Sequence, residues 1–334
     1  MDATGRGPSR AVGVRDVAAR AGVSRQTVSR VLNEHPEVAV DTRERVLAAM
    51  AELGYLVNNA ARALGTRRSR TLGVLASDAL QYGPSRSLAA IESRARGAGY
   101  WVSAAFADAG DARAVVAAVQ HLVSQGVEGI VVVAPHAQTL DALDALQIGV
   151  PIVTLHSAGR GVRGLSVDQA AGARLAVAEL ADAGHTRIAH LAGPADWLEA
   201  ESRAEGYGRE LAARGMSAGP VIVGDWSAAS GHAAAAAVRE LGVTAVFSAN
   251  DQMALGLITG LREAGVDVPQ DVSVVGFDDV PDAAHYWPPL TTIRQDFDEL
   301  ARRAVATVIG EAAAPQHPVQ PELIARSSVV PPRR

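Results

Sequence analysis

The segment VRDVAARAGVSRQTVSRVLN, residues 14–33, has the layout of a helix-turn-helix. Ala18 is small enough to let two helices cross closely, and Gly22 permits a tight turn between them. Apolar inner faces are supplied by three valines, Val17, Val23 and Val28. The segment therefore predicts two short helices, over residues 15–21 and 24–32, joined by a turn.

The second of these helices offers side chains that can read DNA. Ser24 is placed to cap its first turn, and the side chains expected to face outward are Arg25, Gln26 and Arg30. Arginine pairs bidentately with guanine and glutamine with adenine in the major groove, and each good pair discriminates by about 1–3 kcal/mol. The segment therefore predicts a DNA-reading helix. A helical hairpin with a solvated arginine face is the plainer alternative.

Charge is distributed unevenly along the 334 residues. The first 70 residues hold 12 arginines and 7 acidic residues, for a net charge of +5, and the remainder of the chain carries −10. A basic amino-terminal part on an acidic body indicates that this part alone meets a polyanion, although chance clustering would give the same count.

A third helix is expected over residues 41–53, where Asp41 followed by Glu44 has the spacing of a capping box. Beyond residue 71, short apolar runs alternate with alanine-rich helical stretches. The expected strands are residues 72–76, 101–105, 130–133, 187–191, 221–223, 245–248, 272–275 and 322–326. This alternation predicts buried strands in parallel sheets flanked by helices. There are too many units for one small doubly wound sheet, which favours two lobes.

Composition limits the class of protein. The chain is 48% hydrophobic and contains no cysteine, which fits a globular protein in a reducing compartment. It has no apolar run like that of a signal peptide, and none long enough to span a membrane. We therefore expect a cytoplasmic protein that makes no membrane contact.

The sequence contains no enzyme motif in the setting that its chemistry requires. It lacks a Walker loop and His-Glu-x-x-His, and its nine histidines have no metal-ligand spacing. Gly-x-Gly-x-x-Gly at residues 159–164 and Gly-x-Ser-x-Gly at residues 215–219 do not directly follow any of the expected strands, as a dinucleotide site and a nucleophile elbow require. The pair Asp278 and Asp279 could suggest glycoside hydrolysis, but neighbouring side chains of an extended chain point in opposite directions and cannot flank one bond. We expect no catalytic residue, no metal and no cofactor.

Polar side chains follow several of the expected strands. Asn250, Asp278 and Trp226 each come soon after a strand, and Arg203 lies in the helical stretch after another. Ligands of open α/β sheets bind at the carboxyl ends of strands. A guanidinium and a carboxylate can grip neighbouring hydroxyl groups while an indole covers a pyranose ring, so the set fits a sugar. Each residue taken alone is better explained as a surface arginine, a helix cap or a core tryptophan.

Several motifs together resemble the lac repressor (LacI/GalR) family. They are VA–AGVS and TVSRVLN within residues 17–33, TRERV at 42–46, SANDQMALG at 248–256, VGFDD at 275–279 and PPLTTI at 288–293. The resemblance runs from residue 14 to about residue 326. It implies an α/β protein with a small all-α helix-turn-helix head and a two-lobed body, similar to periplasmic binding proteins, built of parallel doubly wound sheets.

The resemblance also implies which segments and residues bind. We expect a head over residues 1–57, a hinge helix and linker over 58–70, and an effector-binding and dimerisation body over 71–334. The hinge helix is expected to fold on the operator and to insert Leu64 into the minor groove. The implied DNA contacts are Ser24, Arg25, Gln26, Thr27, Ser29, Arg30, Asn33, Tyr55, Asn58 and Leu64. The implied effector contacts are Arg203, Asn250, Asp278, Trp226, Phe297, His156 and Gln81.

The sequence departs from the family pattern at several of these positions. Arg25 replaces a tyrosine, which changes the expected operator preference, and Val57 replaces a usual proline in the hinge. Ala39 stands where a capping serine is common, so we expect Asp41 to cap instead. His156 replaces an acidic sugar contact and Gln81 a leucine, so the identity of the sugar stays open.

The sequence therefore predicts a homodimeric repressor that binds a palindromic operator and is released by a glycoside or galactoside-like effector. Two other classes compete with this reading. A solute-binding protein of a sugar transporter would need an export signal and no basic head, and a sugar-processing enzyme would need a general acid or a phosphate loop. The pair Pro331-Pro332 disfavours a further helix there, so we expect a dimer rather than a tetramer.

Overall fold

The computed structural model describes residues 12–33, 35–55, 68–134, 136–156, 164–313 and 317–333. Contacts within the chain divide it into two compact units, Met1–Arg70 and Thr71–Arg334. The first unit is the head, and the second is the body.

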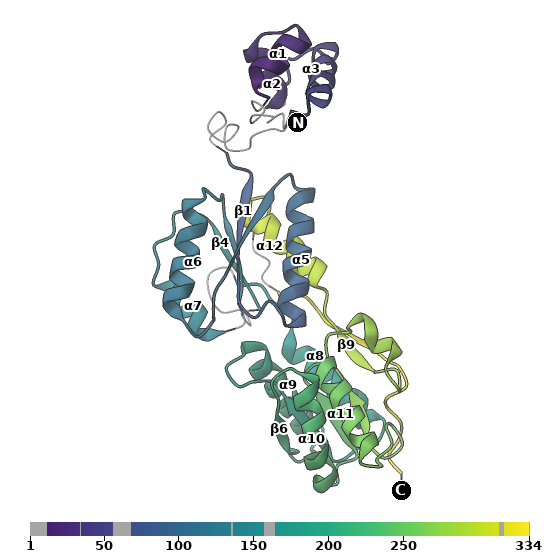
Figure 1. Ribbon diagram of the computed structural model, residues 1–334. Helices are drawn as coiled ribbons and strands as arrows, with labels where there is room; N and C mark the ends of the chain where they lie inside the picture. The colour runs from purple at the N-terminus through teal and green to yellow at the C-terminus, as the bar shows by residue number, and fades with distance from the viewer. Residues whose placement is uncertain are drawn as a thin grey trace, which may run out of the picture. The chain divides into compact units, whose positions relative to one another are not determined.

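The head contains α1 (Val14–Ala21), α2 (Arg25–Leu32) and α3 (Val40–Leu53), drawn in purple in Figure 1. Gly22 adopts the left-handed backbone of the turn, with φ of 66°, as expected of a residue without a Cβ. The head core is small, and its buried members are Val17, Ala18, Ala21, Val28, Val31, Val46 and Ala49. The predicted helix-turn-helix is confirmed.

The predicted cap of α3 is wrong. The helix begins one residue earlier than expected, with Ala39 at the N-cap and no capping hydrogen bond from a side chain. Asp41 therefore lies inside the first turn, where its carboxylate pairs with Arg45 one turn later, at 3.4 Å. An acidic side chain in the first turn still interacts favourably with the helix dipole, so Asp41 stabilises α3 without capping it.

The first lobe of the body is built on a parallel sheet in the order β2-β1-β3-β4. Its strands are β1 (Thr71–Ala76), β2 (Trp101–Phe106), β3 (Ile130–Val133) and β4 (Ile152–Leu155). Figure 1 shows α6 (Ala112–Ser124) and α7 (Ala137–Asp144) on one face of the sheet. The other face is covered by α5 (Tyr82–Gly97) and by α12 (Phe297–Val308), which comes from near the carboxyl end of the chain.

The second lobe repeats this plan in the order β6-β5-β7-β8. Its parallel strands are β5 (Ile188–Ala192), β6 (Val221–Val223), β7 (Ala245–Ser248) and β8 (Ser273–Val275). One face packs on α8 (Gln169–Asp182) and α9 (Leu198–Ala213). The other packs on α10 (Ala228–Leu241) and α11 (Asp251–Glu263). The predicted two-lobed body of parallel sheets is confirmed.

The chain passes between the lobes more than once. It leaves the first lobe after β4 to enter α8, and it returns after β9 (Thr292–Arg294) to form α12. It then re-enters the second lobe as β10 (Glu322–Ile324), which pairs with β9 in antiparallel fashion. The last expected strand is thus present but belongs to a small antiparallel ribbon. These connections join the two lobes and leave a cleft between the lobes. Ligands of such folds bind in that cleft.

Two strands expected to be buried are exposed edges. Trp101 and Phe106 of β2 are 58% and 61% exposed, and Val221 and Val223 of β6 are 53% and 65% exposed. Every residue of the inner strands β3, β5 and β7 is buried. An apolar run predicts a strand, but only the order of strands in the sheet decides which runs become edges.

Within the parts of the chain that the structure describes, no helix is long and apolar enough to cross a membrane.

Candidate functional site

The outward face of α2 carries the residues expected to read DNA. The Oγ atom of Ser24 accepts a hydrogen bond from the backbone N–H of Thr27 at 3.0 Å, so the predicted cap is confirmed. Val28 and Val31 turn inward and are buried. Arg25, Gln26 and Arg30 are exposed, and no other described residue forms a hydrogen bond or an ion pair with their side chains. Their donors are therefore free for a ligand.

The remaining expected DNA contacts lie around this helix. Ser29 and Asn33 are exposed, and the amide of Asn33 lies 3.5 Å from the Ser29 hydroxyl. The hydroxyl of Thr27 bonds that of Ser24 at 2.9 Å. Tyr55 is half-buried against the head core. Asn58, Leu64 and the rest of the expected hinge through residue 67 lie outside the described residues.

A pocket lies in the body, between the start of α5 and the second lobe. It brings together five of the seven expected effector contacts, Gln81, Arg203, Trp226, Asn250 and Asp278. It is also lined by residues that sequence patterns did not single out, Tyr82, Gly83, Pro84, Trp197 and Glu199. Both lobes therefore contribute to one binding surface.

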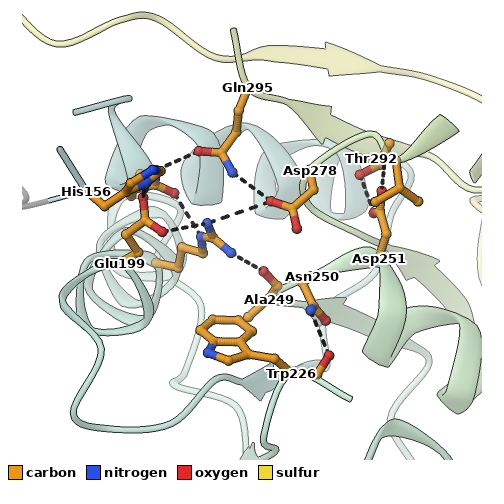
Figure 2. Close-up of polar contacts among 12 residues, drawn as sticks. His156, Glu199, Trp226, Ala249, Asn250, Asp251, Asp278, Thr292 and Gln295 are labelled. Carbon is orange, nitrogen blue, oxygen red and sulfur yellow. Dashed lines mark hydrogen bonds and ion pairs between the residues drawn. The ribbon is translucent and has the colours of Figure 1, made fainter. Parts of the chain in front are cut away.

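Arg203 of α9 is the buried cation of this pocket, with 3% of its surface exposed. Its Nε donates to Gln169 at 2.9 Å, and its Nη1 donates to the backbone carbonyl of Ala249 at the end of β7. The guanidinium also lies 3.9 Å from the centre of the Phe277 ring, an attractive cation–π arrangement. Figure 2 draws the surrounding polar network, in which a dashed line ends at the carbonyl of Ala249. These contacts fix its orientation and leave Nη2 without a direct hydrogen bond to any described residue.

Asp278 faces the same guanidinium. Gln295 donates to its Oδ1 at 2.7 Å, and Arg203 Nη2 lies 3.9 Å from the same oxygen. Burial raises the pKa of Asp278 to about 7, although the charge of Arg203 and the hydrogen bond from Gln295 both favour the carboxylate. Asp278 is thus poised between its charged and neutral forms near neutral pH.

The neighbouring Asp279 points elsewhere, into ion pairs with Arg294 at 2.7 Å and Arg326 at 2.6 Å. The two carboxylates do diverge, but the reason given from the sequence is wrong. Asp278 and Asp279 both have positive φ, of 116° and 52°, so this stretch is a turn rather than an extended strand. The two carboxylates point apart because of that turn and because Arg294 and Arg326 pair with Asp279.

His156 lies behind the pocket rather than in its lining. Only 1% of it is exposed, and both ring nitrogens are engaged, Nε2 with Ser87 of α5 at 2.8 Å and Nδ1 with Glu199 of α9 at 2.8 Å. Phe297, the first residue of α12, is also buried and lines a neighbouring pocket. Its ring meets that of Tyr82 edge-to-face at 6.0 Å. These two expected contacts therefore support residues that line the pocket.

Trp226 and Asn250 form one wall of the pocket together. The Asn250 amide donates to the Trp226 carbonyl at 3.0 Å, and its oxygen caps α11 by accepting from Met253 N–H at 2.9 Å. The Trp226 ring packs edge-to-face on Trp197 at 5.3 Å. It also lies against Gly193, where a Cβ would fall 2.1 Å from the ring. A glycine at position 193 is therefore required for this indole position.

Gln169 and Gln295 join these side chains into one network. Gln169 of α8 donates to Glu199 at 2.9 Å and to Gln295 at 2.7 Å, and both glutamines are buried. The sequence around Gln169 and Glu199 does not mark them as site residues, because each lies in an alanine-rich helix. Only the packing of α8 against α9 brings them together at the cleft. Among the described residues no group of three or more histidine, cysteine, aspartate or glutamate side chains could hold a metal ion.

Comparisons with known proteins agree with this arrangement. Residues 14–58 match the family of bacterial regulatory proteins, lacI family, and residues 177–329 match a periplasmic binding protein-like domain. The chain is 40% identical over 294 residues to the lactose operon repressor of Escherichia coli, which covers 87% of this chain and 82% of that protein. It is 36% identical to the HTH-type transcriptional regulator CelR of Thermobifida fusca, over 90% of this chain and 92% of that one.

A solved structure shares the whole architecture. The lac repressor dimer bound to operator and the anti-inducer ONPF superimposes with a TM-score of 0.85 at 36% identity, over 96% of this chain and all of that chain. The matched regulatory head sets this chain apart from a transporter's solute-binding protein, which was one of the competing classes. The chain belongs to the lacI family of bacterial transcriptional regulators.

Proposed function

We propose that the protein is a repressor that binds a palindromic operator as a homodimer and is released when a sugar occupies the pocket between its lobes. The observation that carries the proposal is the buried Arg203 guanidinium, which faces the pocket beside Asp278 and next to the indole of Trp226. Charge-assisted hydrogen bonds to hydroxyl groups and an apolar ring wall are the two contacts that a pyranose needs.

The head supplies the DNA-binding half of the proposal. Arg25, Gln26 and Arg30 project from α2 without partners in the described chain, which suits contact with base edges and phosphates. We propose further contacts by Ser24, Thr27, Ser29, Asn33 and Tyr55, and by Asn58 and Leu64 in a hinge helix over residues 58–70. A structure of the related lac repressor holds a dimer on its operator, which supports the proposed dimer.

The effector is proposed to be a neutral glycoside. A related structure, 31% identical over 95% of this chain with a TM-score of 0.68, is a complex of the regulator CelR with cellobiose. Galactosides and β-glucosides are therefore the first compounds to test. Action on an operator also places the protein in the cytoplasm, where the regulated DNA lies.

An operator gel shift with a panel of sugars tests the proposal. We expect one member of a set of methyl galactosides, methyl glucosides, lactose and cellobiose to release the protein from DNA. Arg203→Ala should bind the operator as the parent does but lose about 10- to 150-fold in sugar affinity, since a charged hydrogen-bond donor is removed. A parent protein that ignores every sugar, or an Arg203→Ala variant that responds normally, contradicts the proposal.

A further inference from the structure

Glu199 is a buried carboxylate in the first turn of α9 with only one of its two oxygens in use. Its Oε1 accepts from His156 Nδ1 at 2.8 Å and from Gln169 at 2.9 Å. No described residue donates a hydrogen bond to Oε2, which lies 3.8 Å from Arg203 Nη2. The side chain lines the pocket with 4% of the residue exposed. A buried carboxylate oxygen without a donor is costly, so Oε2 is suited to a ligand.

Arg203 Nη2 lies between two carboxylates and bonds neither. It is 3.8 Å from Glu199 Oε2 and 3.9 Å from Asp278 Oδ1, and both distances exceed the range of a direct hydrogen bond. The other guanidinium nitrogens are occupied by Gln169 and Ala249. Nη2 therefore offers two N–H donors, with a carboxylate beside each.

We propose that Glu199 is a further effector-binding side chain and that Glu199, Arg203 and Asp278 together hold two hydroxyl groups on neighbouring carbons of the effector. One hydroxyl donates to Glu199 Oε2 and accepts from Nη2, and the other donates to Asp278 and accepts from Nη2. Each hydroxyl has the one donor and the acceptor lone pairs that this requires. The inference rests on the proposed sugar-binding function. It specifies the part of the sugar that is recognised, which is a pair of hydroxyl groups on neighbouring carbons.

The charges around the site favour a neutral ligand. Burial alone would raise the pKa of Glu199, but the charge and hydrogen bond of His156, together with Arg203, lower it below its ordinary value. Ionised Glu199 offsets the charge of His156, and ionised Asp278 offsets that of Arg203, so these four groups leave no surplus of positive charge for an anion when Asp278 is ionised. A phosphorylated or carboxylated group at this position is therefore disfavoured.

His156 and Ser87 hold Glu199 in place. His156 Nε2 bonds the Ser87 hydroxyl at 2.8 Å, so serine, histidine and glutamate form a continuous chain of hydrogen bonds. Nucleophilic enzymes use the same order of groups, but Ser87 is 1% exposed within α5 and out of reach of a substrate. This chain instead orients Glu199 Oε1, which leaves Oε2 to face the pocket.

Calorimetric titration of Glu199→Gln with deoxy sugars tests the inference. The probes are the panel sugar that the parent binds most tightly and its monodeoxy analogues. We expect Glu199→Gln to bind the full sugar about 10- to 100-fold more weakly than the parent does. Removal of one particular hydroxyl from the sugar should weaken binding to the parent by the same factor and should leave the affinity of Glu199→Gln unchanged. Asp278→Asn should become insensitive to removal of a hydroxyl on the neighbouring carbon. Glu201→Gln, exposed on the same helix, should bind within about twofold of the parent.

The outcomes separate a contact from a supporting role. If Glu199→Gln weakens every sugar and every deoxy analogue by one factor, Glu199 only maintains the pocket and the inference is wrong. The inference is also wrong if Glu199→Gln keeps the parental affinity for the full sugar. It is wrong as well if the two hydroxyls to which Glu199→Gln and Asp278→Asn are insensitive lie on carbons that are not neighbours. A parent that binds its operator but no panel sugar overturns the proposed function itself, and the inference with it.

Discussion

At the scale of single residues, we expect Asp278 to link the proposed sugar binding to pH. Burial raises its pKa to about 7, and only the ionised form can accept two charge-assisted hydrogen bonds. As pH falls through that pKa the carboxylate takes up a proton, so affinity is present above pH 7 and lost below it. We expect the affinity for the effector to fall about tenfold between pH 8 and pH 6, measured by calorimetry in one buffer series.

Asp278→Asn is the matched control for this pH dependence. Its amide cannot titrate, so its weaker sugar affinity should be nearly constant over the same range. A parent whose affinity does not change with pH, or an Asp278→Asn variant that keeps the parental slope, would assign the effect to another group.

Gly193 permits the position of the Trp226 indole, because a Cβ there would lie 2.1 Å from the ring. We expect Gly193→Ala to displace the indole and to lower sugar affinity by at least tenfold while operator affinity is kept. A sugar titration followed by tryptophan fluorescence would measure both the displacement of the indole and the affinity for the sugar. Gly208→Ala is the control, since a Cβ at that position in α9 meets nothing within 4 Å. Parental sugar binding by Gly193→Ala would show that the indole is not part of the site.

The single residues of the site were only partly predictable from sequence. Arg203, Asn250 and Asp278 follow strands or belong to contiguous motifs, so their meeting in one pocket could be expected. Glu199 and Gln169 could not be expected, because each is one polar residue in an alanine-rich helix and only the packing of two helices brings them together. Tertiary contacts of this kind leave no local sequence pattern.

At the scale of elements, α2 is expected to carry sequence-specific DNA binding. Its inner face packs in the head core through Val28 and Val31, while Arg30 is exposed. We expect Arg30→Ala to weaken operator binding by about 10- to 100-fold, because one arginine contact with a base or phosphate is lost. Sugar affinity should be unchanged. Arg209→Ala, exposed in the body, is the control in the same gel shift, and equal operator affinity of both variants would place the reading face elsewhere.

The bounds of the strands were more predictable than their exposure to solvent. Inner strands such as β3 and β7 begin and end where their β-branched and apolar runs do, because short runs of this composition are typical of strands buried inside a sheet. The start of α3 was misplaced, since Asp41 and Glu44 have the spacing of a capping box, but Asp41 instead lies inside the first turn and pairs with Arg45. Exposure of β2 and β6 depended on the order of strands in each sheet, which residue patterns do not encode.

At the scale of the whole molecule, the proposed palindromic operator has two half-sites and needs two heads, so we expect the body to present a surface to a second copy. The outer face of α11 is a candidate for this surface. Leu255 is 37% exposed and Trp287 is 77% exposed, and Arg262, two turns after Leu255, donates to the Trp287 carbonyl. Apolar side chains exposed together on one face commonly mark an interface.

We therefore expect the parent to sediment as a dimer at micromolar concentration and Leu255→Asp and Trp287→Asp to shift it toward monomer. A charge buried without a partner opposes association, and a single head binds only one half-site, so operator affinity should fall while sugar affinity stays. Leu175→Asp on α8 is the control, because Leu175 has nearly the same exposure, 38%, and lies on another helix. Dimers that survive both substitutions would exclude this face, and a parental monomer that binds its operator tightly would exclude the dimer.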